Sequence, residues 1–177
     1  MIVNASNELI DAGYIQIGID HFAKKSDDLG KALSIGSVAR NFNGYNPGRI
    51  KNLIGIGPSG SGRFGIFYMQ NIFSLDDYYS KLSENKLPVL KGYQLDRDDL
   101  IRRDVIDAII CNGVLNFIDI EGKYKINFRE YFEKELASSK AFINDGIIES
   151  DEKSMRITKL GKLFIPPVCS IFDKFFR

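Results

Sequence analysis

The chain has 177 residues, of which 44% are hydrophobic and 27% charged, as is typical of a globular protein with one ordinary domain or two small ones. Its 24 basic and 23 acidic residues nearly cancel, so no strong overall field is available to collect nucleic acid or an anionic membrane surface. The sequence shows no apolar run approaching about 18 residues and no basic signal-peptide start. We therefore expect neither a nucleic-acid partner nor a membrane.

The two cysteines, Cys111 and Cys169, lie far apart in the sequence and have apolar neighbours. This pattern favours reduced, buried thiols over a disulfide framework, and it predicts a cytoplasmic location. No Cys-x-x-Cys spacing is present, and a single histidine cannot build a metal site alone.

The composition changes along the chain. Residues 1–73 hold 11 of the 16 glycines, whereas the remainder is richer in charge and in helical periodicity. We predict a β-rich part over 1–73, a connecting helix and linker over 74–95, and a helical domain over 96–177.

The first part begins with "ELIDAG", which predicts a helix that ends at Gly13. "YIQIGID" (14–20) alternates like a strand, and "FGIFYMQN" (64–71) is a further β-like run. "NLIGIG" (52–57) is nearly all apolar, which predicts a parallel strand covered on both faces.

The second part begins with Ser74, a candidate N-cap. The stretch 96–115 predicts a helix that ends at Gly113, with an apolar face formed by Leu100, Ile101, Val105, Ile109 and Ile110. There follow a predicted helix over 128–146, a hairpin over 147–158, and a final helical stretch broken or restarted at Pro166 and Pro167. This order suggests a winged-helix-like unit.

The segment "DRDDLIRRDVI" (96–106) is dense in charge and could be mistaken for a basic recognition helix. Its four aspartates balance its three arginines. We therefore predict a helix start with intrahelical ion pairs, not a nucleic-acid surface.

The segment "GIGPSGSGRFG" (55–65) holds five glycines. No lysine follows them, so the segment is not a nucleotide P-loop, and its match to G-x-G-x-x-G at 60–65 is weak. Two interpretations stay open: a turn that lets strands pack closely, or backbone contact with a ligand.

Two further segments contain candidate binding residues. Asp20 and His21 follow a predicted strand, where α/β folds place ligand-binding groups, although His21 could equally be hydrogen-bonded within the fold by Asp20. The loop 40–49 mixes arginines with aromatic and amide side chains, which suits either a flat ligand with carboxylates or phosphates, or a solvated turn. Its polar and aromatic residues are Arg40, Phe42, Asn43, Tyr45 and Arg49.

Several phrases together resemble one known family. "IGIDHFAKKSDDL", "RNFNGY", "LIGIGPSGSG", "YMQN" and "IRRDVIDAIICN" occur in the order and spacing of the C-terminal portion of oxygen-independent coproporphyrinogen III oxidases, which are radical S-adenosylmethionine (SAM) enzymes. The resemblance extends from about Gly13 to the end of the chain. The related radical-SAM haem chaperones share "GIGP" but are not expected to carry the other phrases.

The resemblance implies an α+β fold: the final strands of a partial radical-SAM, TIM-like barrel, followed by a mainly helical, winged-helix-like C-terminal domain. Enzymes of this family convert two propionates of coproporphyrinogen III to vinyl groups, using SAM and a [4Fe-4S] cluster held by Cys-x-x-x-Cys-x-x-Cys. Cys111 and Cys169 cannot form that motif. We therefore expect this chain alone to be inactive, with no catalytic residue, no metal ligand and no tightly bound cofactor.

The resemblance also implies binding residues. Ser61 stands where the family has an isoleucine beside SAM, next to Gly60, while Phe42 and Asn43 match a Phe-Gln pair near the second SAM. For the substrate coproporphyrinogen III, the candidate contacts are Arg40, Arg49 and His21. Pro166 and Pro167 interrupt the family's continuous final helix.

Without the preceding barrel strands, the strand at 14–20 would have an unpaired apolar edge. We expect residues 1–73 to be disordered, rearranged or self-associated with a second copy, and residues 96–177 to fold independently. A non-catalytic haem- or porphyrin-binding protein, related to the haem chaperones, is the alternative function.

Overall fold

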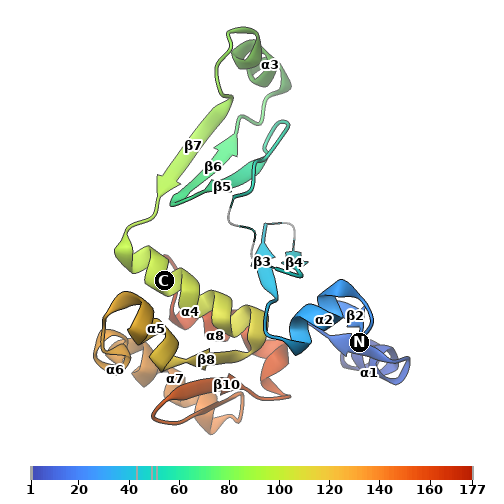
Figure 1. Cartoon of the computed structure of the whole chain (residues 1–177), viewed down its shortest axis with the longest axis vertical. Coiled ribbons are helices and arrows are strands. Elements are labelled where there is room, and N and C mark those ends of the chain that lie inside the picture. Colours follow the sequence, from blue (N-terminus) through green and yellow to red (C-terminus); the bar gives the residue numbers. More distant parts are fainter. Residues whose placement is uncertain (1, 43, 49, 51, 177) are drawn as a thin grey trace. The chain divides into compact units, whose positions relative to one another are not determined.

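The computed structural model describes residues 2–42, 44–48, 50 and 52–176, which form a mixture of helices and small sheets (Figure 1). Two compact units are present: a larger unit of residues 1–49 and 101–177, and a smaller unit of residues 50–100. In the part of the chain so described, each sheet has two or three strands and none closes into a barrel. The predicted domain limits at 73 and 95 follow composition, not packing, and they stay a prediction.

The larger unit begins with a helix and two short strands. Its elements are α1 (Ile2–Asp11), β1 (Tyr14–Gln16), β2 (Phe22–Lys24) and α2 (Asp28–Ser34). The predicted helix end is confirmed, since Gly13 has a φ of 86°. The strand predicted over 14–20 is shorter, because the Ile17 amide donates to the His21 carbonyl and turns the chain back. As a result β1 pairs antiparallel with β2 and has a neighbour on that edge.

A hairpin of β3 (Ala39–Asn41) and β4 (Gly44–Asn46) completes the N-terminal segment. Ile17, Ala23 and Val38 are buried in one small core together with Cys111. Because Cys111 belongs to helix α4 (Arg97–Asn112), these N-terminal residues pack on the C-terminal part of the same unit.

The smaller unit contains a three-stranded antiparallel sheet in the order β5-β6-β7. Its strands are β5 (Ser61–Phe64), β6 (Phe67–Asn71) and β7 (Val89–Gln94), and α3 (Leu75–Ser83) connects β6 to β7 (Figure 1). The predicted N-cap is confirmed: the Ser74 hydroxyl accepts a hydrogen bond from the Asp77 amide.

The buried parallel strand predicted at 52–57 is wrong. Leu53 forms only an isolated bridge to Arg63, while the side chains of Ile54 and Ile56 are 75% and 88% exposed. The backbone of Gly55 lies against that of Gly60, and Gly57 has a φ of 92°, so the segment leaves strand geometry and enters a loop.

Helix α4 begins at a capping box, in which the Asp96 carboxylate accepts from the Asp99 amide and the Asp99 carboxylate accepts from the Asp96 amide. The predicted stop is confirmed by Gly113, with a φ of 65°. Ile101, Val105 and Ile109 are fully buried along one face, as the sequence predicts.

The rest of the larger unit is helical around a small sheet of order β8-β10-β9. The predicted hairpin and the restart at Pro166 are both confirmed, whereas the helix predicted over 128–146 is divided at Phe132. The elements are β8 (Val114–Asn116), α5 (Phe117–Tyr124), α6 (Phe128–Tyr131), α7 (Glu133–Asn144), β9 (Ile148–Ser150), β10 (Ser154–Ile157), the 3-10 turn η1 (Gly161–Phe164) and α8 (Ile165–Ile171).

Phenylalanines fill the centre of this helical part. The rings of Phe117 and Phe128 stack with centroids 4.3 Å apart, and Phe132 and Phe172 are fully buried beside them. Each such burial contributes about 1.5–3 kcal/mol relative to exposure.

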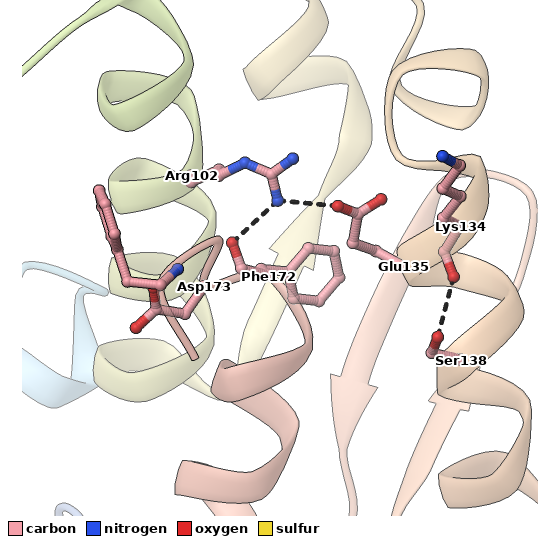
Figure 2. A network of polar contacts seen from close by, with 7 residues as sticks. Arg102, Lys134, Glu135, Ser138, Phe172 and Asp173 are labelled. Atoms are coloured by element: carbon pink, nitrogen blue, oxygen red, sulfur yellow. Dashed lines mark hydrogen bonds and ion pairs between the residues drawn. The ribbon is translucent and has the colours of Figure 1, made fainter. Parts of the chain in front are cut away.

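A polar network joins three helices across this core (Figure 2). Arg102 of α4 donates to the Glu135 carboxylate of α7 at 2.8 Å and to the Phe172 carbonyl, at the end of α8, at 3.1 Å. The charged segment that begins α4 thus pairs between helices through Arg102, and within its own helix through Arg103, which lies 3.5 Å from the Asp104 carboxylate as predicted.

Candidate functional site

The sole histidine lies beside an acidic and a basic side chain in the larger unit. His21 Nδ1 is 2.7 Å from Asp20 Oδ1, so the expected hydrogen bond within the fold is confirmed. This bond from His21 lowers the pKa of the Asp20 carboxyl, and the charge of Arg40 lowers it further. Both side chains of the pair are substantially exposed, so an incoming ligand can reach them.

Tyr45 lies at the centre of this group. Its ring meets the His21 ring edge-on, with centroids 4.9 Å apart, and the Arg40 guanidinium carbon lies 5.7 Å from its centroid. The Tyr45 hydroxyl donates to the Ile110 carbonyl of α4 at 3.2 Å. Burial raises the pKa of Tyr45, so this phenol remains a neutral donor near neutral pH.

We call Asp20, His21, Arg40 and Tyr45 the Tyr45 cluster. It presents an exposed guanidinium and a half-exposed imidazole, and a guanidinium can bind a carboxylate through two parallel hydrogen bonds. Phe42, on the same β3–β4 hairpin, is 57% exposed. Asn43 and Arg49, two other predicted site residues, lie outside the described residues.

The glycine-rich loop of the smaller unit is held by a buried amide. The side chain of Asn71, at the end of β6, donates to the carbonyls of Gly55 and Gly57, each at 3.0 Å. The Tyr78 hydroxyl of α3 accepts from the Gly57 amide at 3.0 Å. The loop carbonyls thus face inward, toward a side chain of the same unit.

Close backbone packing accounts for two of the glycines. A Cβ on Gly55 would lie 2.6 Å from the Gly60 carbonyl carbon, and a Cβ on Gly60 would lie 3.0 Å from the Gly57 oxygen. The backbone amide of Gly60 donates to the Gly57 carbonyl, and the Gly60 carbonyl accepts from the backbone amide of Asn71. The close-packing interpretation of the loop is therefore confirmed at these positions, and both backbone polar groups of Gly60 have partners within the fold.

The remaining predicted cofactor contact, Ser61, lies in β5 opposite Gln70. Ser61 and Gly60 belong to the smaller unit, whereas His21, Arg40 and Phe42 belong to the larger one. The predicted site residues therefore form two separate sets, one in each unit. Sequence reasoning missed Asn71 and Tyr78. A polar residue that ends an apolar strand after a glycine-rich loop is the signal that could have pointed to Asn71.

The two thiols are buried and are not joined in a disulfide, as predicted. Burial raises the pKa of Cys169 to about 12, and the neighbouring Cys111 adds to this rise, so Cys169 is a protonated thiol near neutral pH. Metal ligation and nucleophilic chemistry both need the thiolate. Across residues 2–42, 44–48, 50 and 52–176, no group of three metal-ligating side chains and no helix suited to crossing a membrane is found.

Comparison of the fold defines the class of protein. The chain is similar to a solved structure of coproporphyrinogen III oxidase from Escherichia coli, which is described as a radical SAM enzyme, with a TM-score of 0.94 and 36% sequence identity. The match covers 98% of this chain and 40% of that one. The chain therefore has the fold of one part of a radical SAM enzyme.

The chain is also similar to curated proteins, each of which bears the name oxygen-independent coproporphyrinogen III oxidase. The relative from Pseudomonas aeruginosa is 37% identical over 175 residues, which are 99% of this chain and 38% of the relative. Those from Salmonella typhimurium and Escherichia coli are 40% and 38% identical, each over 96% of this chain and 37% of the relative.

The resemblance to the C-terminal portion of this oxidase is thus confirmed along nearly the whole chain. The chain spans about two fifths of the length of the relatives it matches. No family model matches it.

Proposed function

We propose that this chain forms the C-terminal part of an oxygen-independent coproporphyrinogen III oxidase, which converts coproporphyrinogen III to protoporphyrinogen IX by oxidative decarboxylation. One observation carries the proposal: the structural match at 36% identity over 98% of the chain. At that identity, the similarity includes sequence as well as backbone shape.

Within this role, the Tyr45 cluster recognises substrate carboxylates. The substrate carries propionates, and Arg40 places an exposed guanidinium beside the half-exposed His21. A guanidinium forms charge-assisted hydrogen bonds with a carboxylate, which are roughly twice as strong as neutral ones. Arg49 is proposed as a second carboxylate contact on its place in the motif.

The two cofactors of the family fit this chain differently. Cys111 and Cys169 are too few and too deeply buried to hold a [4Fe-4S] cluster, so its ligands come from residues outside this sequence. SAM supplies the radical chemistry when bound; Gly60 and Ser61 of the smaller unit are proposed contacts for one SAM molecule, and Phe42 of the larger unit is a proposed contact for a second. Asn43 is a further proposed contact for SAM.

We also propose that the β-rich residues contribute the last strands of the intact enzyme's barrel, and that residues 96–177 form a winged-helix-like cover. A helix at 97–112 with the β8-β10-β9 sheet supports the second assignment. The buried, free thiols support a cytoplasmic location.

A chimera tests the function directly. This chain replaces the matching portion of the Escherichia coli enzyme, and anaerobic conversion of coproporphyrinogen III is measured with SAM and a reductant. We expect turnover in the chimera and a KM raised about tenfold or more by Arg40→Ala, the size expected for loss of a hydrogen bond to a charged group.

Arg156→Ala is the matched control, because Arg156 is an exposed arginine on β10, far along the chain from the cluster. Its KM should remain that of the unmodified chimera. A correctly folded chimera that binds its cluster yet shows no turnover would contradict the proposed function.

A further inference from the structure

Tyr45 connects three elements of the larger unit through one side chain. Its ring lies against His21, which follows β1, and against Arg40 of β3, while its hydroxyl donates to Ile110 of α4. Arg40 and His21 of the Tyr45 cluster therefore share one aromatic support, which is anchored to helix α4 of the same unit.

The chain around Tyr45 is shaped to admit this ring. A Cβ on Gly18 would lie 2.4 Å from the Tyr45 hydroxyl oxygen, and a Cβ on Gly44 would lie 3.3 Å from His21 Nε2. Ile17 and Val38 are buried in the core that Tyr45 flanks. Both glycines thus leave room for aromatic rings, which explains their presence at these turns.

A fixed support matters most for Arg40. An exposed arginine has many rotamers, and binding a carboxylate in one geometry costs that freedom. A cation–π contact with Tyr45 restricts the guanidinium before the ligand arrives. Asp20, which holds His21 from the other side, fixes the imidazole in the same way.

We propose that Tyr45 is a positioning residue, which holds Arg40 and His21 together as one recognition site for a porphyrin carboxylate. The inference deepens the proposed function and rests on it. Tyr45 itself touches no substrate in this assignment, because its hydroxyl is engaged with Ile110.

The test uses the 177-residue chain and the stable porphyrin coproporphyrin III as the probe. Because His21 is the only histidine, its Cε1–H resonance at fixed pH reports the position of the Tyr45 ring without ambiguity. We expect Tyr45→Leu to shift this resonance and to weaken coproporphyrin III binding about fivefold, as loss of a cation–π support at an exposed guanidinium implies. Tyr45→Phe keeps the ring and should stay within about twofold of the unmodified chain, since only one neutral hydrogen bond is lost.

Tyr79→Leu is the matched control, since Tyr79 is an exposed tyrosine of the smaller unit, and thermal unfolding of every variant checks that it is folded. The inference is overturned if the probe does not shift His21 in the unmodified chain, if Tyr45→Leu binds normally, or if Tyr45→Phe fails as badly as Tyr45→Leu. Failure of the proposed function looks different: the chimera then lacks turnover although the chain still binds coproporphyrin III.

Discussion

Asp104 is a carboxylate of the larger unit with partners on two helices. It lies on α4, nearly buried, and accepts hydrogen bonds from Lys123 and from the Tyr124 hydroxyl, the latter at 2.8 Å. Arg103 lies 3.5 Å from its second oxygen. Burial raises the pKa of Asp104, but the hydrogen bonds from α5 outweigh burial, so the net pKa is lowered.

This lowered pKa predicts a pH-dependent stability. Asp104→Asn should cost about 1–3 kcal/mol of unfolding free energy at pH 7, because two donors lose a charged acceptor. A carboxylate whose pKa is lower in the folded than in the unfolded protein stabilises the fold at pH values above its unfolded-state pKa of about 3.9. This stabilisation is lost as the pH falls through the folded-state pKa. The difference between the two proteins should therefore be full at pH 7 and shrink as the pH falls below about 3.9.

Urea unfolding at pH 7, 5 and 3 measures this difference, and Glu149→Gln serves as the control because Glu149 is an exposed carboxylate on β9. A destabilisation of Asp104→Asn that is equally large at pH 3 and pH 7 would show that its charge is not the cause.

At the scale of residues, sequence reasoning succeeded where partners are adjacent and failed where they are distant. The Asp20–His21 hydrogen bond joins neighbours in the chain and was predicted. Asp104 does lie near Arg103 of its own helix, but its hydrogen bonds come from α5, where Lys123 is 19 residues away and was not predicted. Such pairs depend on how helices pack, which no local pattern specifies.

At the scale of elements, close backbone packing in the glycine-rich loop restricts which residue can stand at position 55. Gly55→Ala should destabilise the loop by about 1–3 kcal/mol, because the new Cβ would lie within 2.7 Å of backbone atoms of Gly60 and Ser61, which cannot rotate away. The backbone of Gly55 needs no positive φ, so packing alone is tested.

Hydrogen exchange of the Ser59 and Asn71 amides measures this effect locally, since both donate across the loop. Gly122→Ala is the control: its Cβ would meet nothing within 4 Å, and within α5 alanine should be neutral or stabilising. Unchanged protection in Gly55→Ala would mean that the loop can open without cost.

Elements with local signals were predicted well, for the same physical reason. The cap at Ser74 and the stop at Gly113 act on residues within one helical turn of themselves. The segment 52–57 was assigned to a buried strand from its apolar content, but its conformation follows from Gly60, Asn71 and Tyr78, which come later in the chain. Apolar content alone does not distinguish a buried strand from an exposed apolar loop.

At the scale of the whole molecule, the smaller unit exposes many large apolar side chains. They include Ile54, Ile56, Phe64, Phe73, Leu75, Tyr79, Leu87 and Leu90. Strands β5 and β7 are the edges of their sheet, and every residue of β7 is exposed. Exposed strand edges and apolar patches of this kind promote association.

We therefore propose that the isolated chain self-associates through the smaller unit. Sedimentation velocity should show species larger than the monomer that grow with concentration, and the double variant Ile54→Ser, Ile56→Ser should shift the distribution toward monomer. Ile35→Ser is the control, because Ile35 is equally exposed but belongs to the larger unit. A monomer at all concentrations would refute the proposal.

The family resemblance indicated a function that amino-acid composition alone could not indicate. A mixed helix and sheet chain of balanced charge has many functions open to it, and the ordered phrases around His21, Arg40 and Gly55 narrowed these to one family. The part played by Tyr45 as a shared support was not predicted, because it depends on contacts with residues up to 65 positions from Tyr45 along the chain.

The side-chain amide of Asn71 limits how the glycine-rich loop can be exchanged between proteins. The curve of the glycine-rich loop is dictated by a side chain that lies outside the loop, on β6. Residues 55–62 grafted into another scaffold would therefore keep the sequence of the loop but not its conformation. The smallest segment that should keep this conformation is the loop together with the strand that ends in Asn71. A recombination event that separates the two should therefore yield a protein with a distorted loop.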